Sequence, residues 1–411
     1  MKKSIVLAGL VLLVNTAFGQ FSLSGDVLIR SEYRHGYRRM PLPEEEAAAF
    51  VGQRSRLILD FKADRVTTKI SFQDVRFWGQ EEQRVQRPSL DLHEAWVQLA
   101  ITDSLLLRAG RQEIRFENQR FFGVNDWIFP GQKHDALYLR HIGPRSELHV
   151  AAAFNQSAPR LFETDYRVNN YKTLNYVYYR TRIGDNITMS LMGVADGFQN
   201  PDNPEINYVR GTWIPYFEYR TERLLFTLNP AFQHGRTRLG AEINAWYLMG
   251  SVTANINPKV LSTLGVEVFS GNNALDPSPT ERGFDFLYGA AHGFLGYMDY
   301  FTQMPLDARG AGLVSPHIRT EYRFNPKTRL DLDLHVFFLQ NNFLHQGVAI
   351  NKYLGAEIDA KFYYSFNDIT QVAFGYSAMF GSDSMEIIKG GRNEEFAHWA
   401  FVMLRFRPKF L

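Results

Sequence analysis

Apolar and polar residues alternate in long runs over most of the chain, and turn-forming residues separate the runs. Alternation with a period of two is typical of β-strands, because successive side chains of a strand point to opposite faces. Most runs are roughly ten to fifteen residues long, whereas strands of globular proteins average about five or six. A tilted strand that crosses a bilayer needs about 9–11 residues. The length of the runs therefore favours strands that cross a membrane.

The pattern predicts about eighteen strands. They cover residues 21–36, 50–64, 66–79, 90–101, 105–117, 136–142, 146–157, 171–184, 187–199, 208–222, 224–235, 239–257, 260–272, 313–325, 329–340, 353–367, 369–381 and 398–410. Connections after even-numbered runs are short, and those after odd-numbered runs are mostly long. This alternation is typical of bacterial outer-membrane barrels, with short periplasmic turns and long extracellular loops. We therefore predict an all-β fold, a transmembrane antiparallel β-barrel in which the last run pairs with the first.

The first residues of the chain have the pattern of a signal peptide. Lys2 and Lys3 are followed by an apolar stretch over residues 5–14, and Ala17-Phe18-Gly19 offers a small-x-small cleavage site. We therefore expect a signal peptide over residues 1–19, a single barrel domain over residues 20–411, and export to the outer membrane. Beyond the signal peptide, no stretch approaches the about 20 apolar residues of a membrane helix.

Composition excludes several classes of protein. The chain has 45 basic and 43 acidic residues, a net charge of +2, whereas a nucleic-acid-binding protein needs a basic excess or stripe. It has no cysteine, which excludes disulfides and thiolate metal sites. No common catalytic or phosphate-binding motif surrounds its His and Asp residues, so we expect neither an enzyme nor a bound cofactor. Its 33 Phe and 20 Tyr suit the aromatic girdles of a membrane barrel.

Charged residues of the predicted strands lie on the face opposite to the apolar one. A Lys or Arg facing lipid at the bilayer midplane costs about 2–4 kcal/mol, so we expect this ionic face to line the lumen. The candidate pore-lining residues of the strands are Arg30, Arg34, Arg54, Arg56, Arg111, Glu113, Arg115, Arg180, Arg182, Arg319, Glu321, Arg323, Arg405 and Arg407.

The run over residues 105–117 shows both faces. Ile114 and Phe116 form its apolar face, and Arg111 lies on the ionic face with Glu113, Arg115 and Glu117. Arg108 has the opposite parity, so we expect it to reach the headgroups near a periplasmic turn or to follow a bulge.

Two interpretations of the lumenal charges remain open. Arg and carboxylate side chains can pair into a structural network, or unpaired Arg side chains can attract a permeating anion. The interleaved charges of residues 111–117 favour pairing. The runs Arg54/Arg56, Arg180/Arg182 and Arg405/Arg407 favour an anion path, because no carboxylate lies beside them on their own strands.

Two blocks of sequence resemble the alginate-export family of outer-membrane porins. The first reads RAGRQEIRFENQRFFGVNDW over residues 108–127 with HDAL over 134–137, and the second covers residues 270–301. The resemblance implies a barrel of about eighteen strands that passes an anionic polysaccharide through an Arg-rich lumen. It carries over to Arg111, Glu113, Arg120, Asn125, Asp126 and Trp127 in the first block, and to Asp285, Tyr288, His292, Gly296, Tyr297 and Asp299 in the second.

We therefore expect an outer-membrane channel for an anionic saccharide or other small polar solutes. Its partners would be outer-membrane lipid and the barrel-assembly machinery, since Phe410 near the C-terminus resembles an assembly signal. The connections over residues 118–135 and 273–312 are expected to narrow the pore. The alternatives are a general or phosphate-type anion porin and a surface enzyme or receptor embedded in a barrel.

Overall fold

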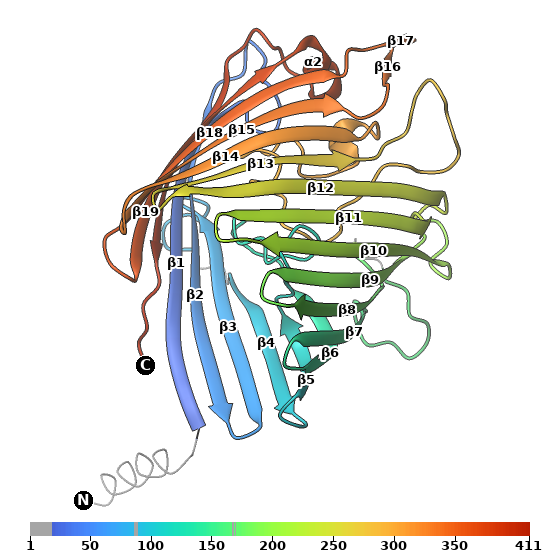
Figure 1. The fold of residues 1–411 in the computed structure, drawn as a ribbon. Helices are drawn as coiled ribbons and strands as arrows, with labels where there is room; N and C mark the ends of the chain where they lie inside the picture. Colours follow the sequence, from blue (N-terminus) through green and yellow to red (C-terminus); the bar gives the residue numbers. More distant parts are fainter. Residues whose placement is uncertain (1–18, 86–88, 167, 169) are drawn as a thin grey trace, which may run out of the picture.

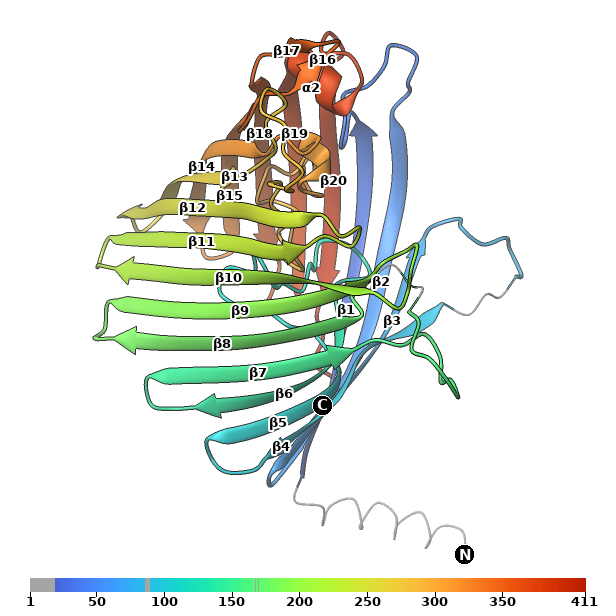
Figure 2. The same cartoon turned by 90° about the vertical axis from the view of Figure 1, so that its right-hand side faces the viewer.

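The chain folds into a closed antiparallel β-barrel of 18 strands in the computed structural model, which describes residues 19–85, 89–166, 168 and 170–411. Each strand pairs with the next one along the chain, β15 pairs with β18 across a loop hairpin, and β20 pairs with β1 to close the barrel. Figures 1 and 2 show this closed wall. The predicted fold class and the pairing of the last strand with the first are confirmed.

Successive strands are connected alternately by a short turn at one end of the barrel and a long loop at the other end. The barrel strands are β1 (Gly19–His35), β2 (Ala48–Ala63), β3 (Val66–Phe77), β4 (Leu90–Ala100), β5 (Leu105–Gln112), β6 (His134–Ile142), β7 (Ser146–Phe154), β8 (Thr173–Ile183), β9 (Ile187–Gln199), β10 (Asn207–Arg220), β11 (Leu224–Arg236), β12 (Glu242–Asn257), β13 (Val260–Phe269), β14 (Leu313–Asn325), β15 (Thr328–Leu339), β18 (Tyr353–Ser365), β19 (Thr370–Gly381) and β20 (Ala397–Phe406). The loops add η1 (Leu306–Ala308), the hairpin of β16 (Leu344–His345) and β17 (Val348–Ala349), and α2 (Asp383–Lys389). Helix α2 and the β16–β17 hairpin lie at the same end of the barrel (Figures 1 and 2).

Every predicted run coincides with one barrel strand, and the largest difference is at β5, which ends at Gln112 instead of residue 117. The predicted signal peptide, residues 1–19, lies outside the described residues except for Gly19, the first residue of β1. Within the described part of the chain, no helix is long and apolar enough to span a membrane.

The wall is apolar outside and polar inside. On β1, Asp26, Arg30 and Glu32 face inward and are buried, whereas Tyr33 on the outer face is 43% exposed. The outer face of the other strands likewise exposes Leu, Ile, Val and aromatic side chains. This is the pattern of a transmembrane barrel, in which lipid covers the apolar outer surface.

The lumen is not an open tube, because two long loops fold into it. They are the β5–β6 loop, residues 113–133, and the β13–β14 loop, residues 270–312, which we call the two inner loops. Phe121 and Phe122 of the first loop and Phe284 and Phe301 of the second are buried together with inward-facing strand residues. The hydrophobic core therefore lies inside the barrel, at the crossing of the inner loops.

Candidate permeation pathway

The two inner loops are joined by backbone hydrogen bonds. The amide of Gly123 donates to the Tyr288 carbonyl oxygen at 3.1 Å, and the amide of Tyr288 donates to the Phe121 carbonyl oxygen at 3.0 Å. A Cβ atom at Gly289 would lie 1.8 Å from the Arg120 carbonyl oxygen, so this contact requires glycine. The loops therefore form one unit across the lumen.

Arg120 lies where the inner loops meet the wall. Its guanidinium is 2.7 Å from the Glu267 carboxylate of β13, and both side chains are almost fully buried. The guanidinium also lies within 5.2 Å of the ring centroids of Phe269, Phe286 and Phe294. This arrangement makes Arg120 an anchor of the first inner loop rather than an open anion site.

Asp126 attaches the first inner loop to strands β20 and β2. Its carboxylate lies 2.9 Å from Arg54, 3.5 Å from Arg56 and 2.7 Å from Arg405. Burial raises the pKa of Asp126, but these guanidinium groups outweigh it and hold the pKa below its ordinary value. The side chain is therefore a carboxylate at neutral pH.

Asp26 of β1 completes this cluster, since its carboxylate lies 3.3 Å from Arg54, 2.6 Å from Arg405 and 4.0 Å from Arg407. Pairing therefore accounts for the Arg54/Arg56 and Arg405/Arg407 runs, and the structure does not support their interpretation as an anion path. The neutralising groups come from an adjacent strand and from a loop, and the sequence of one strand cannot show either.

Trp127 and His292 connect the first inner loop to the second. Their rings stack at 3.9 Å with an interplanar angle of 3°, and the Arg30 guanidinium lies 3.8 Å from the Trp127 ring. His292 Nδ1 is 2.8 Å from an Asp299 oxygen, and the Tyr37 hydroxyl donates to the other Asp299 oxygen. Burial lowers the pKa of His292, so the imidazole is neutral at pH 7.

The remaining family-motif residues hold the second inner loop to the wall. Asp285 lies 2.7 Å from Arg210 of β10, and the Tyr288 hydroxyl donates to Asp196 of β9 at 2.7 Å. The Tyr297 amide donates to Glu357 of β18 at 2.5 Å.

Asn125 of the first inner loop has a left-handed backbone with φ of 47°, which Asn tolerates better than most residues.

The wall partners Asp196, Arg210 and Glu267 are not among the predicted site residues. Each is a charged residue at an inward position of a largely apolar strand, and that was the only signal available.

The placement of β5 corrects the prediction for the 105–117 run. Leu107 and Ala109 face outward, and the register places Arg111 on the same outer face opposite Asp135, with a guanidinium-to-carboxylate distance of 2.8 Å. Arg111 is therefore not a lumenal residue. Ile114 does not face lipid either, because residues 113–117 leave the wall and enter the lumen, where Ile114 is buried.

Arg108 faces the lumen instead of the headgroups, and its guanidinium lies 3.7 Å from the Trp96 ring. The prediction failed because Leu105, Leu106 and Leu107 are all apolar. The lipid-facing side of the run was therefore inferred from Ile114 and Phe116, which lie beyond the end of β5.

Three Arg side chains without an ion pair among the described residues lie in the lumen between the inner loops and the short turns. Strands β5–β8 and residues 113–117 enclose a polar cavity of about 380 Å³ on the side of the short turns. Arg115 and Arg180 line it, and Arg182 follows on the inward face of β8 toward the short turn. Within the described part of the chain, none of these three has a carboxylate within 4.0 Å. Glu113, Glu117 and Glu147 also line the cavity, so these guanidinium groups share it with carboxylates but are not held in an ion pair.

Other predicted pore-lining residues have protein partners. Arg34 pairs with Glu32 at 2.8 Å, and Glu113 lies 2.9 Å from His93 and 3.9 Å from Arg56. Arg319 donates to the Phe294 carbonyl oxygen at 2.7 Å, which ties β14 to the second inner loop. Glu321 pairs with Arg323 at 2.5 Å near the short turn. In the described residues, no group of three or more His, Asp or Glu side chains could hold a metal ion.

Comparison with known proteins identifies the family. The family model described as alginate export matches residues 20–389. The chain belongs to the alginate export family. Its fold and family are those of outer-membrane porins, so the chain is an outer-membrane channel protein. No curated protein sequence matches the chain.

Solved structures with similar folds are also porins. OpdK of Pseudomonas aeruginosa, solved with vanillate, has a TM-score of 0.60 at 12% identity, with 94% of this chain and 99% of that chain covered. OccAB4 of Acinetobacter baumannii has a TM-score of 0.62 at 13% identity, covering 95% and 98%. OccK9 (OpdG) of P. aeruginosa has a TM-score of 0.65 at 12% identity, covering 95% and 99%. At these identities the likeness concerns the fold.

Proposed function

We propose that this alginate-export family channel passes anionic saccharides, or other small polar carboxylates, through the space left beside its inner loops. The observation that carries the proposal is the group of Arg115, Arg180 and Arg182, which form no ion pair within the described residues, whereas lumenal side chains such as Arg30, Arg54 and Arg405 do. A guanidinium binds a carboxylate through two parallel hydrogen bonds, and exposure to water keeps that binding weak enough for release.

The surroundings of these Arg side chains suit a sugar acid. The cavity is also lined by Phe116, Tyr138 and Tyr178, whose rings offer apolar faces beside the charged groups. The membership of the alginate export family supports an anionic saccharide, and the vanillate in the OpdK structure is a small carboxylate bound to a porin of similar fold. The barrel-assembly machinery, acting on the C-terminal strand, would insert the protein.

The experiment is ion conduction across a planar bilayer containing the purified protein. Wild type should conduct with a preference for anions, and oligouronate should block the current. The variant Arg115→Gln/Arg180→Gln/Arg182→Gln should lose that preference. A hydrogen bond to a charged group contributes about 1.5–3 kcal/mol, so block should weaken by about tenfold or more.

The matched control is Arg111→Gln, which also removes a positive charge but from the outer face. It should conduct and be blocked like wild type. A wild type without stepwise conductance would contradict the channel. Conductance that uronate does not block, or that the triple variant leaves unchanged, would favour a general anion porin instead.

A further inference from the structure

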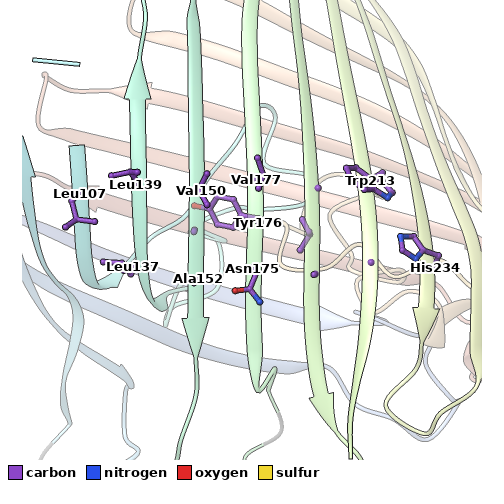
Figure 3. A pocket seen from close by; sticks show the side chains of 15 residues that line it. Leu107, Leu137, Leu139, Val150, Ala152, Asn175, Tyr176, Val177, Trp213 and His234 are labelled. Atoms are coloured by element: carbon purple, nitrogen blue, oxygen red, sulfur yellow. The ribbon is translucent and has the colours of Figure 1, made fainter. Parts of the chain in front are cut away.

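The outer surface of the barrel has a hollow that the permeation pathway does not use. It lies over strands β5–β11 and has a volume of about 600 Å³ (Figure 3). Sites for small ligands typically have volumes of about 300–1,000 Å³. Its lining is almost entirely apolar, and Leu139, Val150, Val177 and Trp213 lie along one row of it (Figure 3). The hollow is therefore a site on the lipid-facing side of the wall.

The floor of the hollow is a row of small residues that crosses neighbouring strands. The register places Ala152 opposite Asn175, Asn175 opposite Ala195, and Ala195 opposite Gly211. Gly193 lies in the next row, and a Cβ atom there would lie 2.8 Å from the Trp213 ring. Large side chains therefore surround a row of smaller ones, and this difference in size forms the hollow.

The hollow lies in the half of the strands that is closer to the long loops, and a polar cavity follows it toward those loops. This cavity has a volume of about 530 Å³ and is lined by residues such as Lys172, Thr173 and Asn207. Thr173 precedes Asn175 by two residues on the same face of β8 and is therefore closer to the long loop. An apolar site on the membrane side thus leads into a polar site at the extracellular rim.

We propose that this surface binds an acylated glycolipid of the outer leaflet, with an acyl chain in the hollow and the sugar head group in the polar cavity. The occupant must be amphiphilic and oriented with its head toward the extracellular side, because the two cavities have that order along the strands. The polar cavity combines Lys172 with the carboxylates of Glu163, Asp165 and Glu205. Three carboxylates beside one ammonium group suit the hydroxyl groups of an uncharged sugar, and their net negative charge disfavours a phosphate.

The test is native mass spectrometry of the full chain in mild detergent, with diglucosyl diacylglycerol, whose sugar head group is uncharged, or phosphatidylethanolamine added in separate samples. Wild type should retain one molecule of the glycolipid and at least tenfold less phosphatidylethanolamine. The variant Ala152→Leu/Ala195→Leu, which fills the floor of the hollow, should retain at least tenfold less of the glycolipid adduct. The control Ala356→Leu/Ala360→Leu makes the same change on the outer face of β18 and should retain the adduct.

Both variants must show the heat-modifiable migration of a folded barrel, which separates lost binding from lost folding. If the hollow variant does not fold, Ala195→Leu alone serves in its place. Absence of a glycolipid adduct on wild type, or its retention by the folded hollow variant, would overturn the proposal. Equal retention of both lipids would overturn the sugar site. A wild-type oligomer that becomes monomeric in the hollow variant would assign the surface to a second copy of the chain.

Discussion

At the scale of single residues, Arg120 shows how this barrel tolerates buried charge. The guanidinium is out of contact with water and lies 2.7 Å from the Glu267 carboxylate. Desolvation of the two charges costs several kcal/mol each, and their mutual attraction compensates for it. Removing one partner of such a pair leaves the other charge buried and uncompensated, whereas an exposed pair contributes about 0–1 kcal/mol.

We therefore expect Arg120→Met to lower the free energy of unfolding by about 3–5 kcal/mol, as a broken buried pair does. Arg323→Met is the control, because its guanidinium forms a pair with Glu321 but is 60% exposed. It should change the free energy of unfolding by less than about 1 kcal/mol. Urea titration of the refolded protein in lipid vesicles measures both values, and equal effects would contradict the anchoring role of Arg120.

At the scale of elements, the inner loops behave as a unit held by a few side chains. Trp127 alone contacts the Arg30 guanidinium, the His292 ring and the rings of Trp399 and Phe401. Loss of these contacts would leave the middle of the first inner loop without its attachment to β1 and β20. The loop would then leave more of the lumen open.

Trp127→Ala should therefore raise the single-channel conductance and add open–closed fluctuations on the µs–ms scale of loop motions. Trp246→Ala is the matched control, since Trp246 is 40% exposed on the outer face of β12. Single-channel recordings in planar bilayers compare the conductance and the fluctuations of both variants with those of wild type. Wild-type conductance in Trp127→Ala would mean that the loop stays in place without this ring.

The docking of the second inner loop should depend on pH through His292. The groups that face it are Asp299, Lys361 and Arg30, with Tyr37 on the far side of the Asp299 carboxylate. Burial lowers the pKa of His292, so the released loop binds a proton more readily than the docked one. Docking is therefore weakened as the pH falls below the ordinary His pKa of about 6.5.

Asp299 adds a second effect in more acidic solution. Burial raises its pKa, but His292 and Tyr37 outweigh burial and lower it, so its contribution is lost only below the ordinary Asp pKa of about 3.9. Conductance should increase as the pH is lowered from about 7.5 to about 5, the range in which His titrates. His292→Gln should remove that increase, and an unchanged pH profile in this variant would assign the effect to other groups.

At the scale of the whole molecule, the wall separates two solvents. Leu228 of β11 faces outward and is 45% exposed, whereas the adjacent Thr227 faces inward, opposite Glu218. Leu228→Arg should lower the free energy of unfolding by about 2–4 kcal/mol, because the charge would lie in lipid near the middle of the strand. Thr227→Arg should have little effect. Unfolding in lipid vesicles measures the difference, and similar effects would contradict the assigned faces.

The sequence by itself determined the wall of this protein. A strand that crosses lipid must be long and must separate apolar from charged side chains, and its turns must be short on one side. The eighteen strands could therefore be located from their own sequences, although not every one shows its faces. The second block that resembles the family lies within an inner loop, and the first runs from β5 through the other inner loop into β6. The signal failed at β5, where three successive Leu residues hide the alternation.

Only the tertiary structure decided which charges are free. Arg54 and Arg405 are neutralised by Asp26 and Asp126, which come from another strand and from a loop far along the chain, while Arg180 has no such partner. The position of a loop inside a barrel depends on contacts between residues distant in sequence, and these leave no periodic pattern. For the same reason, the hollow on the outer wall appears only when the register aligns the small residues of neighbouring strands.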